Sequence, residues 1–166
     1  RLGNTIYGEG TESLEAAVTQ LLADRGLTLA LVDGITGGDV GDRLRDTPHA
    51  DVLISEKRPE DCLKGEAAEH LRDVTETTAV QVQNETGARL GLAVFGLTRQ
   101  PDALTGIHTL AYLSLSDGTQ VITRSFHFGN EEDLMRRWLS TRALDLVRRY
   151  LIGALDEDEA IYRREH

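Results

Sequence analysis

The amino-acid sequence predicts an α/β protein, a three-layer α/β/α sandwich with a mixed sheet. Short apolar runs at 27–32 and 90–95 are typical of strands that are buried on both faces. Helical patterns lie between such runs, and the Asp117-Gly118 turn separates two β-rich segments. Helices that alternate with buried strands, followed by a hairpin and a final helix, indicate a sheet covered by helices.

The composition fits one globular domain. Of the 166 residues, 40% are hydrophobic and 28% are charged. No apolar run approaches the roughly 20 residues that span a bilayer, so we expect no membrane association. The N-terminus has no features of a signal or transit peptide, which favours the cytoplasm. The chain begins without Met, which favours an excised piece of a longer protein.

Charge and residue usage exclude several classes of site. A net charge of −10 would repel a phosphate backbone, so we expect no nucleic-acid partner. The Arg-rich stretch 136–149 is either a solvated helix face or an anion-facing patch. The single Cys62 excludes an internal disulfide, and the five histidines lack ligand spacing. We therefore expect neither a metal nor a cofactor.

The first part of the chain predicts a connector and a helix. Residues 1–10 are Gly-rich and lack periodicity, which indicates an interdomain connector. Thr11 is the predicted N-cap of a helix that ends at Gly26. After the strand 27–32, the pattern predicts a second helix over 39–45.

The middle of the chain predicts a strand at 51–55 and a third helix. This helix should begin near Val74, because Asp73 and Glu76 form a variant of the capping box. Gly87 is its expected C-terminal stop.

The last part of the domain predicts a strand, a hairpin and a long helix. The strand 90–95 should end at Gly96, and the hairpin strands should span 107–115 and 119–128. A helix over 130–152 carries an apolar stripe, with Trp138 predicted in the core and His127 facing solvent. The predicted domain thus spans 11–152, and 153–166 is a charged tail.

The loop between the strand 27–32 and the next helix is the candidate site. It reads Asp33-Gly34-Ile35-Thr36-Gly37-Gly38. Glycines allow a ligand close to the backbone, and a helix start presents free N–H groups. The candidates for ligand binding are Thr36, Gly37, Gly38 and Gly96. The alternative is a purely structural turn in which Thr36 caps the helix.

These residues also carry a resemblance. The segment from Gly26 to Ala30, with the loop Asp33 to Gly38, resembles the GxTLAxAESCTGG motif of the CinA C-terminal family, the nicotinamide mononucleotide deamidases. Residues 6–10, 90–96 and 126–129 resemble other segments of that family. The resemblance covers residues 6–152 and implies the CinA C-terminal fold.

The family's chemistry is implied to use a serine that attacks the carboxamide, with a tyrosine and a lysine as partners. A serine hydroxyl needs such a neighbouring base to become a nucleophile. In this chain Gly34 stands at the serine position, Ser55 at the tyrosine position and Glu60 at the lysine position, while Lys57 lies close by. Glu131 stands where the resemblance implies an arginine after the last strand. No catalytic residue is therefore expected at these positions.

Three hypotheses follow. The first is a non-catalytic domain that acts as a scaffold or oligomerisation module, either as a homo-oligomer or within a longer CinA chain. The second is an active amidohydrolase with a relocated nucleophile, Thr36 or Ser55, and Lys57 as its base. The third is a module that binds a pyridine mononucleotide or another anion without reacting.

Overall fold

The structure, a computed structural model, describes residues 13–58, 70–99, 108–129 and 132–155. The predicted connector and the tail beyond Leu155 therefore lie outside the described residues, as do Thr11, Cys62, Glu60 and Glu131.

The described residues form a five-stranded mixed sheet with helices on both faces. In chain order the elements are α2 (Leu14–Asp24), β1 (Leu29–Asp33), α3 (Asp39–Arg45), a 3₁₀ turn (Ala50–Val52), β2 (Leu53–Lys57), α4 (Leu71–Thr86), β3 (Leu90–Arg99), β4 (His108–Ser116), β5 (Val121–Phe128) and α5 (Glu132–Ile152).

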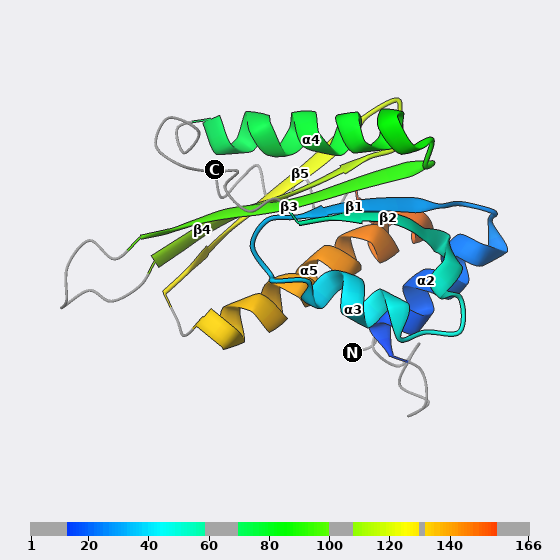
Figure 1. Cartoon of the computed structure of the whole chain (residues 1–166), viewed down its shortest axis with the longest axis horizontal. Coiled ribbons are helices and arrows are strands. Elements are labelled where there is room, and N and C mark those ends of the chain that lie inside the picture. The colour runs from blue at the N-terminus through cyan, green and yellow to red at the C-terminus, as the bar shows by residue number, and fades with distance from the viewer. Residues whose placement is uncertain (1–12, 59–69, 100–107, 130–131, 156–166) are drawn as a thin grey trace.

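The strand order is β2-β1-β3-β4-β5. The interior strand β1 pairs in parallel with β2 and β3, whereas β4 is antiparallel to β3 and β5. Helix α4 covers one face of the sheet, and α2, α3 and α5 cover the other (Figure 1). The predicted three-layer sandwich with a mixed sheet is confirmed.

Burial explains why the main elements form where the apolar pattern predicts them. All five residues of β1 are buried, as a central strand between two helical layers requires. The stripe of α5 is also buried, at Met135, Leu139, Ala143, Val147 and Leu151. Gly87 ends α4 in the left-handed conformation, with φ of 76°.

Several predicted boundaries were wrong. Ser13, and not Thr11, caps α2, because its side chain accepts a hydrogen bond from the Ala16 N–H. Helix α4 begins at Leu71, so Asp73 lies inside the first turn and no capping box forms. The reason is that Leu71 is buried in the core beneath the helix.

Two strands end later than predicted: β2 is shifted by two residues, and β3 is longer. Strand β2 begins at Leu53 and continues to Lys57, so Ser55 lies in its middle. Strand β3 does not stop at Gly96 but continues to Arg99, because β4 remains paired with it as far as His108. Cross-strand pairing, which the local sequence does not reveal, sets both ends.

The prediction that Trp138 belongs to the core was also wrong. Its side chain is 43% exposed, whereas the next residue, Leu139, is fully buried. Trp138 lies at the border of the α5 stripe and packs its ring edge-on against Phe126 and Phe128. His127 is exposed, as predicted from the alternation along β5.

The turn of the hairpin is fastened to α5 through Asp117. Its carboxylate accepts hydrogen bonds from the N–H groups of Thr119 and Gln120, both at 2.9 Å, and from the Tyr150 hydroxyl at 2.8 Å. Partial burial opposes ionisation of Asp117, but these donors outweigh it and hold its pKa below the ordinary value.

We predict that Asp117→Ala lowers the free energy of unfolding at pH 7 by about 1–2 kcal/mol, since five donors lose a charged acceptor. A depressed pKa gives stability that is present above about pH 4 and is lost as the pH falls further. Urea unfolding between pH 7 and pH 3 should therefore show the two proteins converging in acid. Tyr150→Phe, which removes one donor, is the matched control, and a pH-independent difference would contradict the prediction.

Candidate functional site

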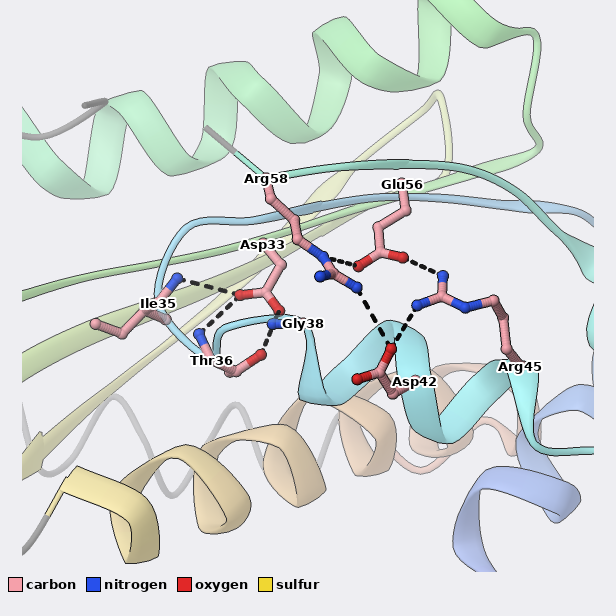
Figure 2. Close-up of polar contacts among 8 residues, drawn as sticks. All are labelled: Asp33, Ile35, Thr36, Gly38, Asp42, Arg45, Glu56 and Arg58. Atoms are coloured by element: carbon pink, nitrogen blue, oxygen red, sulfur yellow. Dashed lines mark hydrogen bonds and ion pairs between the residues drawn. The ribbon is translucent and has the colours of Figure 1, made fainter. Parts of the chain in front are cut away.

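The loop from Gly34 to Gly38 joins the carboxyl end of β1 to the start of α3 (Figure 2). Since β1 lies between its parallel neighbours β2 and β3, the loop sits at the edge of the sheet toward which all three strands run, and β3 continues past it to Arg99. This edge is where open α/β sheets bind ligands.

The carboxylate of Asp33 organises the loop (Figure 2). One oxygen, Oδ1, accepts from the N–H groups of Ile35 at 3.1 Å and Thr36 at 2.8 Å. The other, Oδ2, accepts from the Gly38 N–H at 3.1 Å and from the Thr36 hydroxyl. Asp33 is only 3% exposed. The loop N–H groups that the sequence analysis suggested for an external anion therefore donate to a carboxylate of the chain itself.

Thr36 does not cap α3, contrary to the structural alternative drawn from the sequence. The N-cap is Gly38, which has φ of 98° and makes no side-chain capping bond. Gly37 also has positive φ, of 71°. Two successive left-handed residues place the Thr36 side chain back over Asp33, and both positions favour glycine.

Gly34 is half-buried at the start of the loop, and its N–H donates to the Val94 carbonyl at 2.7 Å. This bond extends the pairing of β1 with β3 by one residue. The backbone at the position of the family's serine is therefore held by the sheet, but it carries no side chain.

Four charged side chains form a cluster between α3 and the end of β2: Asp42, Arg45, Glu56 and Arg58 (Figure 2). Glu56 bonds Arg45 and, at 2.7 Å, Arg58, while Asp42 accepts from the same two arginines at 2.6 Å and 3.4 Å. Partial burial opposes ionisation of Glu56, but its hydrogen bonds with the arginines outweigh it and lower its pKa.

The cluster lies directly against the backbone of α3. A Cβ atom at Gly38 would collide with the guanidinium of Arg58, and one at Gly41 would collide with the carboxylate of Glu56. The two glycines therefore allow the end of β2 to close over the first turn of α3.

The residues proposed as a relocated centre do not gather at the loop. Glu56 and Arg58 face α3, whereas Lys57 points to the other face and binds Glu85 of α4 at 2.9 Å. Ser55 alternates with Glu56 and so lies on the same side of the strand as Lys57. The structure thus separates Lys57 from Thr36, and Glu60 lies outside the described residues.

The ligand-binding candidates have different environments. Thr36 and Gly38 are buried and bonded to Asp33, while Gly37 is exposed. Gly96 lies within β3, where the side chain of Ile35 is 3.0 Å from the position of a Cβ. Because Gly96 has no side chain, it leaves space for Ile35 of the loop.

Asp33, Glu56 and Arg58 were not recognised from the sequence. For Asp33 a signal existed, because an aspartate followed by Gly-x-Thr-Gly-Gly is typical of a side chain that bonds backbone N–H groups further along a turn. The arginine contacts depend on the register of β2 and had no local signal.

Among the described residues, no three histidine, cysteine, aspartate or glutamate side chains come together as a metal site would require. None of the described helices has the length and apolar character needed to cross a membrane.

We predict that Asp33→Ala lowers the free energy of unfolding by about 3 kcal/mol, because it leaves four donors of a buried loop without their acceptor. Thr36→Val removes only one of these bonds and should cost about 1 kcal/mol. Urea denaturation measures both. Equal costs for the two variants would contradict a loop organised by Asp33.

Comparison with known sequences finds relatives of one kind, although no protein-family model matches the chain. The CinA-like protein of Frankia casuarinae is 33% identical over 92% of the chain, and that of Geobacter sulfurreducens is 30% identical over 93%. The chain spans only 38% and 41% of the lengths of these two relatives.

Solved structures show the same fold. CinA superfamily proteins from Klebsiella pneumoniae and Escherichia coli each superpose with a TM-score of 0.67, at 14% and 16% identity. The matches cover 84% and 86% of this chain, and 96% and 88% of those proteins. By sequence and by fold, the chain belongs to the CinA-like, competence/damage-inducible protein family.

Proposed function

We propose that this chain is a non-catalytic CinA-type domain that serves as a scaffold or oligomerisation module. The observation that carries the proposal is Gly34, which stands where the resemblance implies the attacking serine. Acyl transfer by this route requires an oxygen nucleophile at that position. Removing the nucleophile from a well-studied serine hydrolase costs on the order of a million-fold in rate.

A relocated nucleophile finds little support in the geometry. The Thr36 hydroxyl is directed at Asp33, and the residue is only 3% exposed, so a substrate carbonyl has no open approach to it. Ser55 lies on the α4 side of β2, away from the loop N–H groups that could stabilise an oxyanion. Lys57 forms an ion pair with Glu85 of α4 at 2.9 Å, so its amine is directed away from the loop.

A non-reacting anion site at the loop is also poorly supported. Asp33 already accepts from the N–H groups of Ile35, Thr36 and Gly38. An incoming phosphate would have to compete with this carboxylate, and the neighbouring Arg58 is already paired with Asp42 and Glu56. A pyridine mononucleotide therefore remains the alternative ligand, and binding measurements decide it.

A structural role fits what the domain retains. One hydrophobic cluster includes residues from α2 to α5, and the N–H groups of Gly34, Ile35, Thr36 and Gly38 in the loop are hydrogen-bonded. Because the chain spans about 40% of the length of related CinA-like proteins, we infer that it acts beside other segments. In that setting a stable fold can position or associate chains without turning over a substrate.

We predict that the protein releases no ammonia from nicotinamide mononucleotide above the enzyme-free rate. A family member that carries the Glu-Ser-Cys-Thr-Gly-Gly motif is the positive control. Gly34→Ser should remain inactive, because Lys57 faces α4 and supplies no base at the loop.

Turnover by the unmodified protein would overturn the proposal. Thr36→Ala and Ser55→Ala then identify the source, since activity lost in one of them assigns the nucleophile. Calorimetry with the same mononucleotide tests the binding alternative, for which saturable heat that weakens with salt is the signature.

A further inference from the structure

Large apolar side chains that remain exposed gather on one helix. In the part of the chain that the structure describes, three of the six such side chains lie on α5: Leu134 is 64% exposed, Trp138 43% and Ile152 45%. The other three are spread over β2, β4 and β5. Several large apolar groups on the surface of one element indicate an interaction surface.

These side chains share one side of α5. Ile152 follows Leu134 by about five helical turns, so the two lie on the same side. Trp138 and the exposed Arg142 follow Leu134 in steps of one turn and stay within about a quarter turn of that side, as does the half-buried Asp145. We call these five residues the outer row of α5. The buried apolar stripe of the helix lies opposite to it.

The order of residues in the outer row is self-complementary. An apolar residue stands at each end, and a cation and a carboxylate are neighbours in between. A second α5 can lie antiparallel on the first, with a two-fold axis between Arg142 and Asp145. Leu134 of each copy then faces Ile152 of the other, and Arg142 faces Asp145. The two-fold axis repeats each of these pairings.

The facing charges are able to pair. Among the described residues, Arg142 contacts the rings of Trp138 and Phe126, with its guanidinium 4.2 Å and 5.8 Å from their centroids, and no carboxylate. Asp145 Oδ2 accepts one bond, from Arg149 at 2.8 Å. Because a carboxylate oxygen has two lone pairs, Oδ2 can accept a further donor. A parallel alignment would instead place like charges opposite each other, which is unfavourable.

The outer row is long and narrow. From Leu134 to Ile152 it extends about 27 Å along α5, and a helix with its side chains is about 10 Å wide. Contact along this length requires nearly antiparallel axes, which is the packing class with a crossing angle of about 20°. The footprint is smaller than the roughly 800 Å² per partner of a standard interface. We therefore expect a weak dimer, with a Kd on the order of 10 µM.

We propose that two copies of this chain associate through the outer row of α5, antiparallel and with Leu134 of each copy against Ile152 of the other. The inference rests on the proposed oligomerisation role and deepens it, because it names the surface through which copies meet. It requires nothing of the loop at Gly34.

Trp138 reports on this contact directly, because it is the only tryptophan in the chain. Burial of its exposed part should move the emission to shorter wavelength as the protein concentration rises. Light scattering over the same range should show the mass rising from one chain to two. Both curves should give the same Kd.

Two variants at exposed positions test the alignment. Leu134→Glu and Ile152→Arg should each weaken the dimer at least about tenfold, because each places a charge against an apolar side chain. An equimolar mixture of the two variants should associate more tightly than either alone. In that mixed dimer the new carboxylate faces the new guanidinium, while the unchanged Leu134 and Ile152 meet in the other half. Ile54→Glu on β2, where the isoleucine is also 45% exposed, is the matched control and should leave the Kd unchanged.

Three outcomes would overturn the proposal. The first is a monomer at concentrations up to about fifty times the expected Kd. The second is a dimer that neither variant weakens, which would leave the oligomerisation role in place but assign it to another surface. The third is a mixture that associates no more tightly than the single variants. Far-ultraviolet circular dichroism verifies that each variant is folded, and ammonia release from nicotinamide mononucleotide by the same samples tests the proposed lack of catalysis separately.

Discussion

The carboxylate of Asp33 is the interaction on which the candidate site depends. It lies at the last position of the interior strand β1, is almost fully buried, and accepts from three backbone N–H groups and one hydroxyl of the following loop. An unpaired donor in such a place costs free energy, so the carboxylate fixes the path from β1 into α3. The same contacts that stabilise the loop also occupy the groups an external anion would need.

Around Asp33 the chain retains the fold of a CinA-like domain, and charged side chains of the chain itself cover the start of α3. Arg58 and Glu56 pack on the glycines of α3, which have no Cβ to obstruct them. The backbone at Gly34 is held by β3, yet it presents no reactive atom. An open apolar side chain, that of Trp138, lies on α5 close to the loop, since Arg137 of the same helix pairs with Asp39. On these grounds we propose a positioning role for the domain.

Local pattern was sufficient where one physical signal dominates. A continuous apolar run predicted the buried strand β1, and the helical spacing of apolar residues predicted the stripe of α5. The Asp-Gly pair predicted the hairpin. The local pattern did not predict where β3 ends, because pairing with β4 extends this strand past Gly96. It also placed Lys57 near the site, because only the register of β2 shows that this side chain faces α4. The lack of a serine side chain at Gly34 could be read directly from the sequence, because it depends only on the loop motif.

The central claim is that the loop serves the fold and not a substrate. The most direct measurement is a ¹H–¹⁵N NMR titration with nicotinamide mononucleotide, following the amides of Gly34, Thr36 and Gly38. The account predicts that these resonances do not move, and that the Thr36 and Gly38 amides are protected from hydrogen exchange by Asp33. Saturable shifts of these amides, together with formation of the acid mononucleotide in the same tube, would contradict it.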